Sequence, residues 1–490
     1  MTDMRKLFLV VMAAWAAALP TRLGAVTYYV DSASGDDAND GRSEAAAWKS
    51  LKCVNAAAKG LKGGDRVLFR RGGLWRGSLR PGSGEKGNPI LYSSYGEGPK
   101  PILQQSADYS DPKDWAELEP GVWSTVRPFG KQDAGILILD HGERWGVKRM
   151  WGKHELKDDL DFWFDPEKQN VLVKHPKNPG EAFRSVEIAR TTHVISEGGC
   201  HDVTYDGLCV RYGAAHGFGG GDTANVVIRN CDVYWIGGGL QYWRTNAKGE
   251  RYPVRYGNGI EFWGACRNNL VERNRLWQIY DAALTNQTKE NPRHETDVTW
   301  RDNVIWQAEY SFEYWNHDPR SFTGNVLFEH NTCVDAGYCW SHAQRPNPNG
   351  AHLMFYDNSA PTTNFVVRHN VFVRTTDRST RMFNDWRMKD AAAKDGLDLH
   401  DNLYWIPGNA IYEYHVAARD RKADPSAKPL RFGAGADAFA RYVAATGLDR
   451  GSVYVEPKFR DEAKRDYRLV NGPLCPDGTV YGARGIPGLD

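Results

Sequence analysis

The chain of 490 residues has almost no net charge, because 62 Lys and Arg residues are balanced by 61 Asp and Glu residues. Without a basic excess no net field gathers nucleic acid or an anionic membrane, so we expect neither as a partner. The sequence also lacks a C-x-x-C pair, a serine or cysteine nucleophile in a recognisable elbow, and a glycine-rich phosphate loop opening a helix. These absences argue against a zinc ribbon, acyl transfer and nucleotide chemistry.

Long apolar runs are scarce, and the one that is present lies at the N-terminus. Arg5 and Lys6 precede an apolar run from Leu7 to Leu19, and residues 23–25 (LGA) form a suitable cleavage site. This pattern is typical of a secretory signal, so we interpret residues 1–25 as a signal peptide and expect a secreted or periplasmic protein. No second run of about 18 apolar residues follows, so we expect no membrane span.

Glycine and tryptophan, in contrast, are abundant, with 50 and 18 residues, which favours β-structure with frequent turns. The segment from about 203 to 405 repeats one phrase, in which alternating apolar residues precede two polar residues, the second being asparagine, and a further apolar strand. The copies occupy residues 226–234, 270–278, 298–306, 326–334, 365–373 and 397–405, with the asparagines Asn230, Asn274, Asn303, Asn331, Asn370 and Asn402. Residues 203–211 fit the phrase with glycine in the asparagine position.

These asparagines follow one another at intervals of 28 to 44 residues, which is typical of a solenoid in which one repeat is one turn. We predict that each asparagine takes the left-handed conformation of a bend, and that stacked asparagines form an internal amide ladder. Third strands are expected at residues 259–264, 283–287, 311–316 and 352–358. Three short strands per turn predict a parallel β-helix. A β-sandwich is the alternative, since it too has short strands with regular turns.

Regions outside the repeat lack the asparagine phrase. Residues 44–59 have a helical pattern that suits a cap on the N-terminal end of the coil. Tryptophan-rich residues 105–190 are predicted to form an inserted small β-subdomain, and residues 456–473 to close the other end of the stack. The predicted organisation is a signal peptide (1–25), an N-terminal cap with the first coils (26–104), the insertion (105–190), central coils with a groove (191–410), and C-terminal coils with a cap (411–490).

Several stretches resemble the right-handed parallel β-helix proteins of the pectate-lyase-like superfamily. They are YYVDSASGDDANDG (28–41), GGDRVLFRRGGLWRG (63–77), GNPILYSSYGEGPKPIL (87–103) and the asparagine repeat. The resemblance implies an all-β, carbohydrate-active protein, a right-handed β-helix solenoid with an N-terminal capping helix and the inserted β-subdomain. That superfamily includes polysaccharide lyases, glycoside hydrolases, sugar epimerases and noncatalytic fibres, and a shared fold does not select among these functions.

Acidic residues are predicted to meet on one face of the coil, because aligned residues of neighbouring turns are about 4.8 Å apart. If Ile260, Leu284, Phe312 and Leu353 point inward, Glu261 and Glu313 point outward two turns apart, on one exposed face. Asp281 and Glu309 precede two of these anchors by three residues, so they lie on adjacent turns. A separation of about 5 Å suits a retaining glycosidase, and roughly 9.6 Å approaches the spacing of an inverting one.

The placement resembles that of β-helix glycosidases, whose two carboxylates come from neighbouring coils. We therefore expect a glycoside hydrolase that uses Asp281 with Glu309 or Glu313, supported by Glu261. Two long loops, 237–257 and 337–350, enter just before third strands and are expected to wall the groove, where aromatic rings stack on sugars and polar groups bind hydroxyls. The expected substrate-binding residues are Trp243, Arg244, Tyr252, Arg255, Trp315, His342, Gln344 and Arg345.

Two other functions stay open at this stage. The superfamily resemblance also allows a polysaccharide lyase that acts on a uronate polymer, with Ca²⁺ on Glu261 and Glu313 and a base among Arg345, Lys289, His317 and His342. A noncatalytic carbohydrate-binding β-helix is the third possibility. A hydrolase would need no cofactor, and we interpret the acidic loop 34–41 as an ordinary turn. In every case the expected partner is a polysaccharide or oligosaccharide, bound by a monomer.

Overall fold

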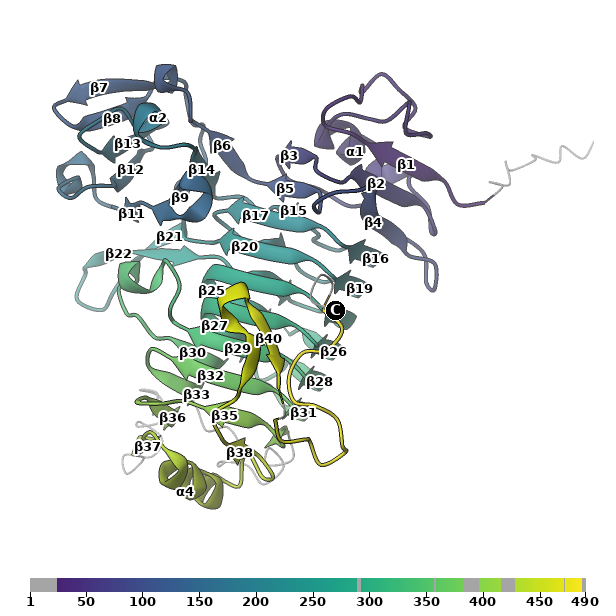
Figure 1. Ribbon diagram of the computed structural model, residues 1–490, viewed down its shortest axis with the longest axis vertical. Coiled ribbons are helices and arrows are strands. Elements are labelled where there is room, and N and C mark those ends of the chain that lie inside the picture. Colours follow the sequence, from purple (N-terminus) through teal and green to yellow (C-terminus); the bar gives the residue numbers. More distant parts are fainter. Residues whose placement is uncertain are drawn as a thin grey trace, which may run out of the picture.

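The computed structural model describes residues 24–288, 292–356, 358–382, 396–415, 428–470 and 472–486. Most of this chain winds into one elongated coil whose strands stack along the long axis (Figure 1). Residues 1–23 of the predicted signal peptide lie outside the described ranges. No helix within these ranges has the length and apolar character needed to cross a membrane.

One face of the coil is a ten-stranded parallel sheet in which each strand comes from a successive turn. Its strands, in spatial order, are β1 (Thr27–Val30), β2 (Arg66–Arg70), β4 (Ile90–Tyr95), β16 (His201–Asp206), β19 (Ala224–Arg229), β24 (Arg267–Glu272), β26 (His294–Arg301), β28 (Phe322–Glu329), β31 (Thr362–Arg368) and β34 (Leu397–His400). Side chains alternate between the two sides of each strand, so Val226 and Ile228 of β19 share the inward side and are fully buried in the core.

A seventeen-stranded sheet forms the remaining faces of the coil. It contains β3 (Leu74–Arg76), β5 (Ile102–Gln104), β15 (Ile195–Ser196), β17 (Cys209–Gly213), β18 (Phe218–Gly219), β20 (Asp232–Ile236), β23 (Ile260–Trp263), β25 (Arg275–Thr288), β27 (Val304–Asn316), β29 (Thr332–Ala336), β30 (Ala351–Phe355), β32 (Val371–Thr375), β33 (Arg378–Met382), β35 (Leu403–Trp405), β36 (Ala410–Tyr414), β37 (Leu430–Phe432) and β38 (Val453–Tyr454). The first half of β25 pairs with β20 and its second half with β23, so β25 crosses two faces. The fold is the predicted right-handed parallel β-helix, and the β-sandwich alternative is wrong.

An asparagine ladder runs through the interior of the coil, as predicted. Each side-chain amide donates to the side-chain oxygen of the asparagine one turn further on, at 3.0 to 3.1 Å. Its members, all fully buried, are Asn274, Asn303, Asn331, Asn370 and Asn402. The ladder satisfies polar groups that would otherwise be costly inside the coil.

Asn230 does not belong to this ladder, and the predicted left-handed backbone is wrong for the five ladder asparagines. The strand register pairs Arg229 with Glu272, so Cys231 and not Asn230 is aligned with Asn274. The left-handed residue of each bend is the one before the ladder position, for example Arg273 with φ of 55°. Asn230 itself has φ of 55°, and Gly207 occupies the same position one turn earlier. The ladder amide must point inward, so the adjacent residue makes the bend.

The N-terminal helix α1 (Leu51–Ala57) is shorter than predicted. Ser50 caps it by accepting a hydrogen bond from the N–H of Cys53, while Asp37 accepts from the N–H groups of Lys49 and Ser50. The predicted helical residues 44–50 are held in non-helical backbone because Trp48 pairs with the edge of β1. The acidic loop is thus a structural turn that anchors the helix start. Leu51 and Val54 enter the main core, while a capping role for α1 stays a prediction.

A second helix, which the sequence patterns did not predict, is α4 (Ala436–Thr446). It lies at the C-terminal end of the coil, where Phe439 and Tyr442 pack on Tyr404 and Tyr412 (Figure 1). The segment predicted to close this end contains the hairpin of β39 (Phe459–Asp461) and β40 (Asp466–Leu469). This hairpin packs on the flank of the coil, where outward rings such as Trp306 form an apolar strip that contacts Tyr467.

The insertion forms its own β-subdomain at the N-terminal end of the coil (Figure 1). Its two sheets contain β6 (Ser106–Asp108), β7 (Trp115–Glu119), β8 (Val122–Thr125), β9 (Ala134–Leu139), β10 (Arg144–Trp145), β11 (Val147–Lys148), β12 (Asp161–Asp165), β13 (Asn170–Lys174) and β14 (Val186–Arg190), with the short helix α2 (Pro179–Ala182). Almost all neighbouring strands are antiparallel, and the subdomain has a separate apolar core.

Candidate active site

A corner between two faces of the coil brings Asp281 and Glu309 close together from neighbouring turns. β25 and β27 pair in two registers that differ by one residue, so β25 carries a bulge at this corner. In the register after the bulge Ala282 pairs with Tyr310, which places Asp281 opposite Glu309. Bulges re-aim side chains and are common beside active sites. The two acids therefore lie on adjacent turns, as their spacing predicts.

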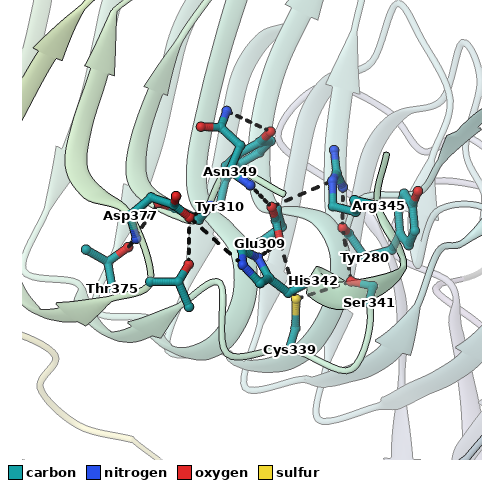
Figure 2. Close-up of polar contacts among 12 residues, drawn as sticks. Tyr280, Glu309, Tyr310, Cys339, Ser341, His342, Arg345, Asn349, Thr375 and Asp377 are labelled. Carbon is teal, nitrogen blue, oxygen red and sulfur yellow. Dashed lines mark hydrogen bonds and ion pairs between the residues drawn. The ribbon is translucent and has the colours of Figure 1, made fainter. Parts of the chain in front are cut away.

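Arg345, from the loop 337–350, binds both of these acids. Its Nη2 donates to Asp281 Oδ1 at 3.2 Å, and its Nε lies 3.7 Å from Glu309 Oε1. Its Nη1 donates to the carbonyl of Tyr280 at 2.6 Å, and the guanidinium lies over the rings of Tyr280 and Tyr310 (Figure 2). The neighbouring Asp281 carboxylate holds the pKa of this guanidinium well above its usual range, against the effect of burial. Arg345 is therefore a fixed cation.

Glu309 is fully buried and surrounded by donors (Figure 2). Oε1 accepts from the N–H of Asn349 at 2.7 Å, and Oε2 lies 3.0 Å from His342 Nδ1 and 3.7 Å from the Cys339 thiol. The hydrogen bond to Glu309 raises the pKa of His342. These contacts use both oxygens of the Glu309 carboxylate. Glu309 therefore orients the loop that carries His342 and Arg345, and its oxygens are not open to a substrate.

Glu261 and Glu313 lie in one outward column on the next face of the coil. The register pairs Glu261 with Thr285, Thr285 with Glu313 and Glu313 with Met354, in agreement with the predicted alignment. The expectation of an exposed face is wrong, however, because Glu261 is only 6% exposed and Glu313 only 5%. Both point away from the core of the coil, but polar and aromatic side chains of loops and neighbouring turns enclose them.

Burial raises the pKa of Asp281, Glu261 and Glu313. The pKa of Glu313 is raised well above its usual range by burial first, and then by the nearby Asp281 and Glu261. Burial raises the pKa of Glu261 to about 7. The pKa of Asp281 is also raised by burial, but the Arg345 charge opposes that rise. Glu313 Oε2 has no hydrogen-bond partner among the described residues, so Glu313 is the acid best suited to hold a proton at neutral pH.

Glu261 is positioned by two residues that the sequence patterns did not single out. Asn258 Nδ2 donates to Glu261 Oε2 at 2.7 Å, and Asn258 Oδ1 accepts from the N–H of Ala282 at 3.0 Å. His216 Nδ1 accepts from the N–H of Asn258 at 2.9 Å, which assigns the ring proton to Nε2, 3.3 Å from Glu261 Oε1. Burial lowers the pKa of His216 to about 3, so this donor is neutral. No recognisable motif connects these residues in the sequence.

An aromatic column runs beside the acid column, two residues further along each strand. Trp263 pairs with Gln287 and Gln287 with Trp315, and the Trp315 ring lies 6.0 Å from that of Tyr356. Trp263 is 37% exposed, so part of this column is open to solvent. Trp315 was predicted to bind the substrate. Trp263, Gln287 and Tyr356 were not predicted to do so, although the same alignment places them next to the acid column.

The predicted loop residues divide into two groups. His342 and Arg345 reach the acids, as described above. Gln344 instead binds the inserted subdomain, accepting from the N–H of Lys148 at 3.1 Å and donating to the carbonyl of Gly146 at 3.1 Å. Its amide thus joins the loop to the inserted subdomain, and its role in substrate binding stays a prediction.

The other loop, which contains the hairpin of β21 (Gly239–Thr245) and β22 (Arg251–Tyr256), contributes less than expected. Arg255 lies over the Tyr280 ring and donates to the carbonyl of Gly238 at 2.7 Å. Trp243 packs on Trp151 of the insertion, with ring centroids 4.7 Å apart, and Arg251 lies over it. Arg244 lies 5.8 Å from the ring of Tyr242.

Three predicted residues remain, namely Tyr252, His317 and Lys289. Tyr252 is 37% exposed on the hairpin, and His317 lies beside Trp315 with ring centroids 6.4 Å apart. Lys289 lies outside the described residues. The structure therefore gathers the acids, His342, Arg345 and Trp315 in one region, and it leaves Trp243, Arg244 and Tyr252 on a separate hairpin.

No family model matches the chain. A lacto-N-biosidase of Bifidobacterium longum subsp. longum is 42% identical over 88 residues, which make up 17% of this chain and 6% of that protein. The match thus spans a small part of the relative's length.

Two solved structures illustrate the similarity in three dimensions. A structure described as a glycoside hydrolase has a TM-score of 0.49 and 9% identity, covering 80% of this chain and 94% of that one. The pectate lyase Pel9A has a TM-score of 0.38 and 11% identity, covering 82% of this chain and 79% of that one. No reaction follows from similarity at this level.

Proposed function

We propose that the protein is an exported glycoside hydrolase that cleaves a polysaccharide or oligosaccharide, with Asp281 and Glu313 as its carboxylate pair. The observation that carries the proposal is the difference between their surroundings. Asp281 has a hydrogen-bonded cationic partner at 3.2 Å, whereas Glu313 is buried and its Oε2 has no hydrogen-bond partner among the described residues. Burial raises the pKa of both acids, and Arg345, hydrogen-bonded to Asp281, opposes the rise at that residue. Two neighbouring carboxyl groups whose environments push their pKa values apart are the requirement for acid and nucleophile or base in glycoside hydrolysis.

The roles of the two acids follow from these environments. Glu313, which holds its proton at neutral pH, is suited to protonate the leaving glycosidic oxygen. Asp281 is suited to act as the charged nucleophile or base, since Arg345 favours its ionised form. The sequence also allowed Glu309 as the catalytic partner of Asp281, but Glu309 is fully buried and its oxygens already contact Asn349 and His342. We assign Glu309 to positioning the loop.

The aromatic column supports a sugar as the substrate. Tryptophan faces bind the C–H surface of sugar rings. Trp263 and Trp315 lie on the two strands next to Gln287, one on each side, and each is two residues beyond an acid of the column. An amide between two indoles suits hydroxyl recognition. The short similarity to a lacto-N-biosidase agrees with a carbohydrate substrate. We make no assignment of the sugar or its linkage from it.

The lyase alternative has less support from the contacts at the site. A lyase needs a base that can lose its proton, but the carboxylates beside Arg345 hold the pKa of that residue well above its usual range. A calcium ion on Glu261 would compete with the hydrogen bonds that Asn258 and His216 direct to its two oxygens. We therefore propose hydrolysis without a required cofactor.

The test is incubation of the purified protein with a panel of plant and algal polysaccharides and oligosaccharides. Release of reducing ends without the absorbance of an unsaturated uronate is the expected result. Unsaturated products that disappear with a chelator would establish the lyase, and sugar binding without any product would establish a noncatalytic protein. Export is tested separately, by locating the full-length chain and a variant that lacks residues 1–25 after cell fractionation, and gel filtration tests the expected monomer.

A further inference from the structure

A second group of reactive side chains lies on the flank of the coil, where the C-terminal residues pack. Residues 474–480 form a tight turn in which Cys475 donates its N–H to the carbonyl of Thr479 at 2.8 Å, and Leu474 pairs with Val480. This turn lies against the bends of two neighbouring coil turns, at His330 and His369. These histidines occupy the left-handed positions next to the asparagine ladder, which are fixed by the backbone of the coil.

The turn directs two potential metal ligands toward His369. Ligand atoms of His369, Cys475 and Asp477 all lie within 4.8 Å of one another. Asp477 Oδ2 is 3.8 Å from His369 Nδ1, while Oδ1 accepts from the N–H and the hydroxyl of Thr479. Thr479 thus holds the Asp477 carboxylate so that its other oxygen points toward the His369 imidazole.

A fourth donor, the nitrogen of a second histidine, lies beside this group. His330 Nε2 is 3.2 Å from His369 Nδ1. His330, His369 and Cys475 are 4%, 6% and 3% exposed, so these donors lie under the surface, whereas Asp477 is exposed. His330 Nδ1 has no hydrogen-bond partner among the described residues.

We propose that these four residues form a structural zinc site. Two imidazoles, a thiolate and a carboxylate are ligand types that Zn²⁺ takes, and ligands at about 2.0 to 2.3 Å from the ion lie roughly 3.3 to 3.8 Å apart in a tetrahedron. His369 Nδ1 lies 3.8 Å from Asp477 Oδ2 and 3.2 Å from His330 Nε2. Cys475 Sγ, within 4.8 Å of the ligand atoms of His369 and Asp477, would move inward on binding. On binding, the Cys475 thiol loses its proton to solvent, and each neutral imidazole keeps one proton on the nitrogen that does not bind the ion.

The site would fasten the C-terminal residues to the coil. The same segment docks through the N–H of Ala483, which donates to Thr332 Oγ1 at 2.9 Å, and through Arg484, which binds Asp302 at 2.8 Å. Ion binding would join two coil turns to a segment more than a hundred residues further along the chain. None of the acids proposed for hydrolysis takes part, so the zinc proposal and the hydrolase proposal fail independently.

The test uses the full-length protein after chelator treatment and dialysis under reducing conditions. Addition of Co²⁺ is expected to produce the near-ultraviolet thiolate-to-cobalt band and the visible bands of a tetrahedral site, and one equivalent of Zn²⁺ is expected to remove both. Zn²⁺ should also raise the melting temperature. Cys475→Ser should abolish the charge-transfer band, and Asp477→Asn, at an exposed position, should weaken Zn²⁺ binding at least tenfold.

Matched controls keep the result interpretable. Cys53→Ser removes a half-buried free cysteine far from the cluster, and Asp437→Asn removes an exposed acid of α4, so both should bind like the wild type. If Cys475→Ser fails to fold, Asp477→Asn still decides the question. Absence of the cobalt band in folded wild-type protein would overturn the proposal, as would equal Zn²⁺ affinity of Asp477→Asn and Asp437→Asn.

Discussion

Arg345 Nη2 lies 3.2 Å from Asp281 Oδ1, and this contact joins a loop residue to the bulged corner of β25. The same guanidinium lies between Asp281 and a second buried acid, Glu309. One cation therefore compensates two carboxyl groups that would otherwise repel each other on adjacent turns.

Replacing Arg345 by methionine should reduce both turnover and stability. Asp281 and Glu309 would lose their shared cation, and breaking a buried pair in this way costs about 3–5 kcal/mol. We expect at least a hundredfold loss in kcat/KM on the active substrate, measured together with urea unfolding. Arg345→Lys should recover part of the stability but little of the activity, because an ammonium cannot bind both acids and the Tyr280 carbonyl. A lysine variant with wild-type kinetics would contradict this role.

Glu313→Gln should remove activity without harming the fold. The buried Glu313 carboxyl holds its proton, so an amide of the same shape replaces it with a change in the free energy of unfolding of about 1 kcal/mol or less. Loss of a general acid should lower kcat by roughly 10² to 10⁴. The matched control is Glu329→Gln, since Glu329 pairs with Arg368 on another face. Full turnover of Glu313→Gln would refute the assignment of the acid.

Glu261 should make stability depend on pH. Burial raises its folded pKa to about 7 from the usual value of 4.5, so the folded state binds this proton more tightly than the unfolded state. Its contribution is complete below about pH 4.5 and is lost as the pH rises toward 7, by up to about 3 kcal/mol. Urea unfolding at a series of pH values should show this loss for the wild type relative to Glu261→Gln. Parallel curves for the two proteins would show that Glu261 does not titrate in this way.

The ladder predicts a difference between two asparagines. Asn303→Ala should lower the free energy of unfolding by about 1–3 kcal/mol, because it removes one hydrogen-bond partner from each of the buried amides of Asn274 and Asn331. Asn230→Ala should cost less, since Asn230 makes a partly buried bond to Asp206 and lies outside the ladder. Urea unfolding compares the two variants directly. Equal losses would mean that the ladder adds nothing beyond an ordinary hydrogen bond.

The aromatic column predicts which tryptophans bind the substrate. Trp263→Ala and Trp315→Ala should each raise KM about tenfold, equivalent to about 1.4 kcal/mol of lost binding. Trp243→Ala should leave KM unchanged, because Trp243 packs on Trp151 of the insertion. Steady-state kinetics on the same oligosaccharide test all three variants. A large effect confined to Trp243 would move the binding surface to the hairpin.

Strand register was predictable where apolar anchors recur. The alignment on Ile260, Leu284 and Phe312 correctly placed Glu261 and Glu313 in one column, because the side-chain alternation of a strand leaves no other choice once the anchors are buried. The error at Asn230 shows the limit of such alignment. The polar pair around Asn230 looks in sequence like the polar pairs that end in a ladder asparagine, although it is shifted by one position. Only the strand pairing shows the shift.

The amino-acid sequence alone determined the coil, its amide ladder and the columns of outward residues, because these depend on short-range alternation repeated in every turn. Tertiary structure decided which loop residues reach the acids, that the acids are enclosed, and that His216 and Asn258 hold Glu261. Loops have no repeating period, so their paths depend on packing against other parts of the chain. The environment of each carboxyl group, and with it the chemistry, is set by those paths.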